Sequence, residues 1–92
     1  FLEEVARKGA AIRQRLAAMP HVREVRGMGM MIGVVLDAGT ARAVAEDCLQ
    51  NGLLILTAKT LLRLLPPLNI TREELDKGLS ILESVLERIE DQ

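Results

Sequence analysis

One arginine stands out as a residue that could bind a ligand. Arg63 lies within residues 61–68, a run that is otherwise apolar and contains Pro66 and Pro67. A buried charge without a partner is costly, so Arg63 must meet an anion or keep a path to water. From a rigid strand, its guanidinium group could bind a carboxylate ligand through two parallel hydrogen bonds. The same pattern equally suits an arginine at a sheet edge that pairs with a carboxylate of its own fold or extends into solvent.

The glycines, the histidine and the cysteine favour structural roles. Gly27, Gly29 and Gly33 have the spacing G-x-G-x-x-x-G, and a strand rather than a helix follows, so they do not match a dinucleotide-binding turn. A turn and a close backbone approach are the better interpretation. His21 and Cys48 are each the only residue of their type and lack partners at metal-ligand spacing. We therefore predict no metal site, with His21 in a solvated turn and Cys48 in the core.

Charge and aromatic content argue against nucleic acid as a partner. The net charge is −1, which produces no strong field toward nucleic acid or an anionic membrane. Four arginines could gather near the first turn, but the chain has a single aromatic residue and so no stacking platform for bases. A solvated face is the better interpretation of this set: Arg13, Arg15, Arg23 and Arg26.

Length and composition indicate one small globular domain over residues 1–92. The chain is 49% hydrophobic and 27% charged, which is too apolar for disorder. No apolar run approaches the ~20 residues that span a bilayer, and the start shows no signal-peptide pattern. With its lone cysteine, the chain is expected to be cytosolic. It begins at Phe1, inside an amphipathic pattern and without an initiator methionine, so we expect a piece of a longer protein.

Apolar periodicity predicts the first half of the chain as helix, two strands and helix. A surface helix covers residues 1–19 and ends at Pro20, and residues 22–26 suit an edge strand. Residues 27–29 form a tight reversal or a bulge, and residues 30–36 form a central strand covered on both faces. Thr40 then caps a helix whose apolar stripe is Ala41, Val44, Ala45, Cys48 and Leu49.

The second half is predicted as two strands and a helix. Asn51 and Gly52 end the preceding helix, although the pair also suits a hairpin. A buried strand at residues 53–56 turns at residues 57–60 into the strand that carries Arg63. Thr71 and Glu74 form a capping box, with Ile70 and Leu75 as its hydrophobic staple. The last helix has a stripe that favours packing on the sheet over a coiled coil: Leu75, Leu79, Leu82, Leu86 and Ile89.

The predicted fold class is therefore α+β, a small, mostly antiparallel sheet of about four strands covered by three helices. Three segments within this order resemble a known family. They are residues 25–33 (VRGMGMMIG), 51–54 (NGLL) and 62–71 (LRLLPPLNIT). Together they resemble the carboxy-terminal domain of class III aminotransferases, and the RLLPPL segment is typical of the acetylornithine aminotransferase subgroup. The resemblance covers essentially the whole chain.

The resemblance implies the small domain of a fold type I enzyme that uses pyridoxal phosphate. It implies amino transfer from N2-acetyl-L-ornithine to 2-oxoglutarate, in arginine biosynthesis, by a cytosolic homodimer. The family's arginine before Pro-Pro binds the substrate α-carboxylate and falls on Arg63. The cofactor lysine and its pocket lie in the family's large domain, upstream of this segment, while Lys8, Lys59 and Lys77 stand in polar contexts here. No catalytic or cofactor-binding residue is expected in this chain, which should be inactive alone.

Other functions remain open on the residues alone. Ornithine and 4-aminobutyrate aminotransferases share the implied architecture, and Val35 stands where the family commonly has a glutamate. A free-standing regulatory module that binds an amino acid is a further possibility, as is a purely structural interaction domain.

Overall fold

The structure is a computed structural model that describes residues 2–28, 31–37, 39–58, 61–67 and 69–89. The predicted order of elements is confirmed within these residues. In chain order they are α1 (Leu2–Ala17), β1 (Val22–Met28), β2 (Met31–Leu36), α2 (Ala41–Gln50), β3 (Leu56–Ala58), β4 (Leu61–Leu64) and α3 (Arg72–Glu87).

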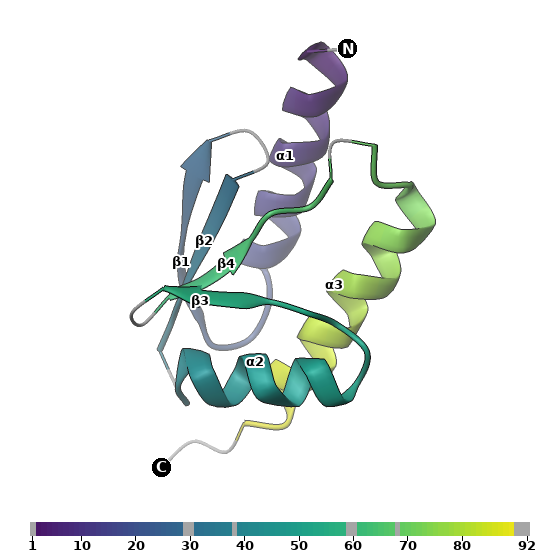
Figure 1. The fold of residues 1–92 in the computed structure, drawn as a ribbon. Coiled ribbons are helices and arrows are strands. Elements are labelled where there is room, and N and C mark those ends of the chain that lie inside the picture. Colours follow the sequence, from purple (N-terminus) through teal and green to yellow (C-terminus); the bar gives the residue numbers. More distant parts are fainter. Residues whose placement is uncertain (1, 29–30, 38, 59–60, 68, 90–92) are drawn as a thin grey trace.

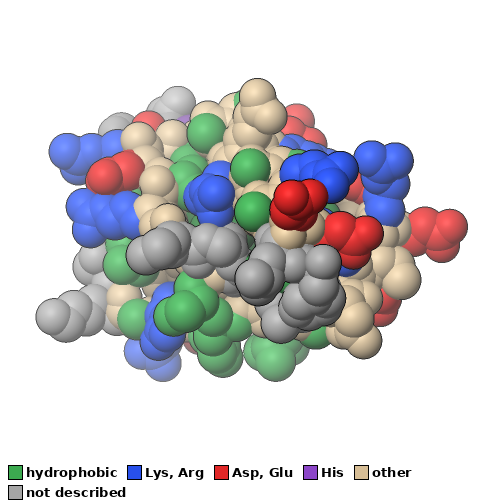
Figure 2. Space-filling model, turned by 90° about the horizontal axis from the view of Figure 1, so that it is seen from above, with side chains coloured by type: hydrophobic (Ala, Val, Ile, Leu, Met, Phe, Trp, Pro, Cys, Tyr) green, Lys and Arg blue, Asp and Glu red, His purple; other side chains and the backbone are tan. Residues whose placement is uncertain are grey.

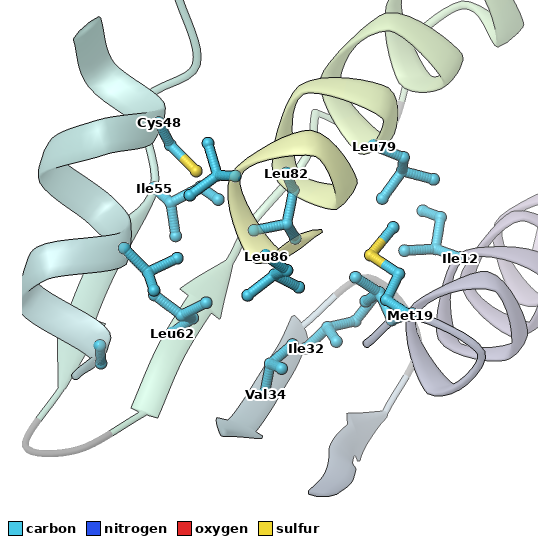
Figure 3. Close-up of a cluster of buried hydrophobic side chains, with 14 residues drawn as sticks. Ile12, Met19, Ile32, Val34, Cys48, Ile55, Leu62, Leu79, Leu82 and Leu86 are labelled. Carbon is cyan, nitrogen blue, oxygen red and sulfur yellow. The ribbon is translucent and has the colours of Figure 1, made fainter. Parts of the chain in front are cut away.

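The described strands form one antiparallel sheet in the order β1-β2-β4-β3 (Figure 1). The edge position predicted for the first strand is confirmed, because only β2 pairs with β1. The three helices pack on one face of this sheet: Ile32, Val34 and Leu62 point from β2 and β4 toward them (Figure 3). The predicted α+β class, with a small antiparallel sheet and three covering helices, is thereby confirmed.

The core lies between the sheet and the helices, and α3 occupies its centre between α1 and α2 (Figure 3). Leu82 and Leu86 of α3 are fully buried, as is Leu16 of α1. The stripe predicted for the last helix therefore packs within its own domain and not in a coiled coil. The remaining buried residues are Ile12, Met19, Ile32, Val34, Ala41, Val44, Cys48, Ile55, Leu62, Leu79 and Val85.

Polar contacts fix the first helix to the last. The Lys8 ammonium donates to the carbonyl oxygen of Ile70 at 3.0 Å, just before α3 begins. The Arg15 guanidinium lies 2.9 Å from the Asp76 carboxylate and 3.1 Å from the Ser80 hydroxyl oxygen. Exposed ion pairs contribute little on their own, so these contacts set the position of α1 more than its stability.

The end of α2 follows the prediction for Asn51 and Gly52. The Gly52 N–H donates to the carbonyl of Leu49, and the Leu53 N–H donates to that of Cys48. Gly52 has φ of 93°. This is a Schellman motif, which requires a left-handed residue directly after the helix.

Two predictions near this helix end were wrong. The strand predicted at residues 53–56 is instead β3 at Leu56–Ala58, because the Leu53 N–H is bonded to the helix end and is not free to pair. β3 is also an exposed edge strand, and in the segment before it only Ile55 is buried. Leu49, predicted on the apolar stripe of α2, is 58% exposed.

The capping box at the start of α3 is confirmed. The Thr71 hydroxyl oxygen accepts from the Glu74 N–H at 3.1 Å, and the Glu74 carboxylate accepts from the Thr71 N–H at 3.1 Å. The Thr71 hydroxyl also donates to this carboxylate at 2.9 Å. These bonds, led by the one from the backbone N–H, lower the pKa of Glu74.

This pKa shift predicts an acid-sensitive contribution to stability. A carboxyl group whose pKa falls on folding stabilises the fold above its unfolded pKa, and this stabilisation is lost as the pH falls below about 4.3 and through the folded pKa. We expect Glu74→Gln to flatten the fall in the urea midpoint between pH 6 and pH 3. Glu73→Gln, in the same turn but outside the capping box, is the matched control. An equal flattening in both variants would contradict the assignment.

The prediction that the strand at residues 30–36 is covered on both faces was wrong for one face. Residues 31–36 are central in the sheet, but helices cover only one of their faces. Met31 is 61% exposed on the other face, because the described residues hold no second layer there. The apolar character of this strand on both faces thus exceeds what the described fold buries.

The reversal or bulge predicted at residues 27–29 does not include its first two residues. Gly27 and Met28 belong to β1 and pair with Ile32 and Met31, and Gly29 lies outside the described residues. Gly27 has φ of 126°, and a Cβ atom there would collide with the carbonyl oxygen of Met31. Glycine at position 27 is therefore required by the backbone itself.

Candidate functional site

Arg63 lies in the middle of β4, on the sheet face opposite the helices, which we call the open face. Its neighbour Leu62 is fully buried toward the helices, whereas the Arg63 side chain is exposed. Across the sheet it is paired with Gly33 of β2 and Leu56 of β3. Within the described part of the chain Arg63 makes no ion pair or side-chain hydrogen bond. Of the interpretations left open by the sequence, an arginine paired inside its own fold is therefore excluded there.

The surroundings of Arg63 on the open face are mostly apolar. Leu61 lies two residues before Arg63 on the same strand, and Leu56 is directly across. Val35 and Met31 lie on the same face of β2, because alternate residues of a strand share a face. Arg63 is thus an exposed cation among mostly apolar neighbours, with its guanidinium group free to meet a carboxylate.

A second arginine lies in the same row of the sheet. Arg26 of β1 pairs with the other side of Gly33, so the row runs Arg26, Gly33, Arg63. The Arg26 guanidinium lies 3.0 Å from the Glu24 carboxylate. Its hydrogen bond and positive charge lower the pKa of Glu24. Of the two guanidinium groups, the one on Arg63 therefore carries the charge that the described chain does not balance.

Exposed apolar side chains extend beyond the sheet. Figure 2 shows apolar side chains gathered along the lower margin of that view, away from the acidic side chains visible in it. Exposed apolar patches are typical of surfaces that contact a partner or a ligand. No helix in the described ranges is long and apolar enough to cross a bilayer. The most exposed large apolar residues described are Met31, Leu49, Leu54, Leu56 and Leu65.

Two hollows on other parts of the surface are less suited than the open face to binding an anion. A groove of about 490 Å³ between α1 and α3 is lined by cations, among them Lys8 and Arg15, by the acid Asp76 and by apolar residues. Lys8 and Arg15 are already bonded to Ile70 and Asp76. A cavity of about 140 Å³ beside α3 is lined by apolar residues and one acid, Glu74, so it offers an anion no partner.

His21 and Cys48 have the structural roles that the sequence favours, with one difference. The His21 side chain is 15% exposed, less than a solvated turn residue, and its Nδ1 lies 3.3 Å from the Asp37 carboxylate. Cys48 is fully buried in the core as predicted, and burial raises the pKa of its thiol to about 11. The described residues contain no cluster of histidine, cysteine and acidic side chains that could hold a metal ion.

The described lysines do not fit an aldehyde cofactor. Lys8 is bonded to a backbone carbonyl, and Lys77 lies exposed on α3. A lysine that forms an imine needs a pocket that lowers its pKa and an acidic partner for the ring nitrogen. Lys59 lies outside the described residues.

The sequence singles out Arg63 as a candidate but does not show which residues lie beside it in the sheet. Gly33 and Arg26 were both singled out, each for a different reason, and neither was connected with Arg63. Their alignment depends on the register of three strands, which no local sequence signal specifies. The run of apolar residues around Gly33 was the available hint, because it exceeds what one covered face requires.

Comparison with known proteins identifies the family. The family model for class III aminotransferases matches residues 1–86. Acetylornithine aminotransferase of Haemophilus ducreyi is 49% identical over 87 residues, which is 94% of this chain and 22% of that protein. Ornithine aminotransferase of Bordetella pertussis is 44% identical over 90 residues, again 94% and 22% of the two chains. The chain thus spans about a fifth of the curated relatives that it matches.

Solved structures agree with this result. N-acetylornithine aminotransferase from Stenotrophomonas maltophilia K279a superposes with a TM-score of 0.85 at 38% identity, covering 92% of this chain and 26% of that one. Acetylornithine aminotransferase from Elizabethkingia anophelis gives a TM-score of 0.80 at 26% identity, covering 92% and 24%. From its sequence and its fold, this chain belongs to the class III aminotransferases.

Proposed function

We propose that this chain is the carboxy-terminal small domain of an acetylornithine aminotransferase. The whole enzyme would move an amino group between N2-acetyl-L-ornithine and 2-oxoglutarate, a step of arginine biosynthesis. In this proposal residues 1–92 form a single domain whose open face meets the larger part of the enzyme. The exposed, unpaired Arg63 on that face is the observation that carries the proposal.

Arg63 binds the α-carboxylate of the substrate in this proposal. Its strand is held by β2 on one side and β3 on the other, so the side chain starts from a fixed backbone. A guanidinium group bonds a carboxylate through two parallel N–H donors, which fixes both the position and the orientation of the ligand. Both the amino donor and the oxo-acid acceptor carry such a carboxylate, so one arginine serves both.

Pyridoxal phosphate would be held outside this chain. When bound, this cofactor supplies the group that carries nitrogen between the two substrates. Because neither Lys8 nor Lys77 is placed to hold it, we assign cofactor binding to the large domain. We further propose that the whole enzyme is a cytoplasmic homodimer, and that this chain alone is inactive.

An assay of the whole enzyme tests the function. We expect the purified full-length protein that carries this chain to form glutamate from 2-oxoglutarate when N2-acetylornithine is supplied. The 44% identity to an ornithine aminotransferase makes free ornithine the second candidate donor. A kcat/KM at least tenfold higher for ornithine would favour that activity, and no glutamate from either donor would refute the proposal. The isolated 92-residue chain, tested alongside, should form none.

A further inference from the structure

Nothing within the described fold explains why position 33 is a glycine. Gly33 is not among the glycines with positive φ. A Cβ atom built there would meet only Leu61 Cδ1 at 3.8 Å and the Arg26 carbonyl oxygen at 4.0 Å, which are ordinary contacts. Gly27, by contrast, combines a positive φ with a collision. Glycine weakens a strand interior, and neither the backbone nor a contact among the described residues requires it at position 33.

The missing side chain leaves a hollow beside Arg63. Gly33 forms its floor, with Arg26 and Arg63 on the neighbouring strands and Met31 and Val35 along β2. The two arginine Cα atoms are roughly 10 Å apart, two strand spacings. Leu61 Cδ1, at 3.8 Å, is the side-chain atom nearest to the missing Cβ position, and neither arginine side chain comes within 4 Å of it. The space over Gly33 is therefore bordered by Leu61 and is not occupied by the arginines. A group of a few atoms could enter between the two side chains.

The charges around the hollow favour an anion over an apolar group. An apolar side chain inserted here would remove water from the Arg63 guanidinium without pairing it, which is costly, whereas Arg26 already pairs with Glu24. The acidic residue closest to this row in the strand register is Glu24. It forms an ion pair with Arg26 of the same strand, and its register partner on β2 is Val35. The N–H donors of Arg63 therefore remain available to a ligand that enters this space.

We propose that Gly33 is a positioning residue that leaves room for the carboxylate end of the substrate between Arg26 and Arg63. This inference rests on the proposed function. The ligand class is an aliphatic amino or oxo acid, whose carboxylate bonds to Arg63 while its first carbon atoms lie over Gly33. A side chain at position 33 fills that space and holds the carboxylate away from the guanidinium fork. Gly33 thereby determines how closely a ligand approaches Arg63.

The test compares Gly33→Ala and Gly33→Val in the full-length enzyme. The probe is glutarate, an unreactive five-carbon dicarboxylate, with its Kd measured by calorimetry next to KM for donor and acceptor. We expect Gly33→Val to raise the glutarate Kd and both KM values at least tenfold, and Gly33→Ala to raise them less. Ala58→Val adds two carbon atoms to the open face two strands away, more than Gly33→Ala and fewer than Gly33→Val, and should leave them unchanged. Gly33→Ala should not lower the urea midpoint.

Three outcomes would overturn the inference. The first is unchanged glutarate binding in Gly33→Val. The second is a lower urea midpoint with unchanged affinities, which would mean that another protein segment fills the hollow. The third is an equal loss of affinity in Ala58→Val. If Arg63→Ala still weakens glutarate binding in these cases, the proposed function survives; if it does not, the proposed function fails as well.

Discussion

Replacing Arg63 with alanine in the full-length enzyme should raise KM for both the amino donor and 2-oxoglutarate by roughly 30- to 150-fold. Hydrogen bonds to a charged group contribute about 2–3 kcal/mol, and each 1.4 kcal/mol changes an affinity tenfold. Both substrates should be affected because both present a carboxylate to the same fork. Arg63→Lys should recover part of the loss, since lysine keeps the charge but not the two parallel donors. Steady-state kinetics with each substrate varied in turn measures the effect.

The unfolding temperature of Arg63→Ala should stay close to that of the wild type. The side chain is exposed and has no partner in the described chain, so its removal leaves the core intact. Arg42→Ala is the matched control, an exposed arginine on α2 that pairs with Glu46 at 3.5 Å. Equal KM values in Arg63→Ala and Arg42→Ala would remove Arg63 from the substrate site.

The largest loss of stability is expected from Leu82→Ala. Leu82 is fully buried in α3, at the centre of the layer between the other helices and the sheet (Figure 3). Removing a buried leucine side chain costs about 2–5 kcal/mol, the spread reflecting how far the cavity collapses. Folded domains are stable by only ~5–15 kcal/mol, so this change removes a large share of the total.

Urea unfolding of the 92-residue chain, followed by far-ultraviolet circular dichroism, measures this loss. The method suits a chain with one phenylalanine and neither tryptophan nor tyrosine. Leu54→Ala removes the same atoms from a residue that is 72% exposed, and it should change the free energy of unfolding by less than about 0.5 kcal/mol. Similar losses in the two variants would show that Leu82 does not occupy the core.

Local signals were sufficient to predict the helices. The Thr71 and Glu74 pair specified the start of α3, and Asn51 with Gly52 specified the end of α2, because caps and terminators act within a few residues. The chemical character of Arg63 was also predictable, since a lone cation in an apolar run has few stable environments.

Features that depend on distant parts of the chain were not predictable. Leu53 looked like the start of a strand, but its N–H bonds the end of α2. Leu49 matched a helical stripe, yet the described fold leaves it uncovered. The strand of Gly33 suggested two covered faces, and only one is covered within the described residues. Each error concerns which backbone group or side chain is bonded or covered by another part of the chain, and local periodicity carries no information on such contacts.

The central place of α3 also bears on how the protein is made. Ribosomes deliver the chain from its amino end, and α3 leaves the exit tunnel after every other element described here. Until then the sheet and the first two helices lack Leu82 and Leu86, as well as the anchor that Asp76 gives to Arg15. This domain therefore cannot complete its core until α3 has been synthesised. Nascent chains that stall before α3 should be targets for chaperones and proteases.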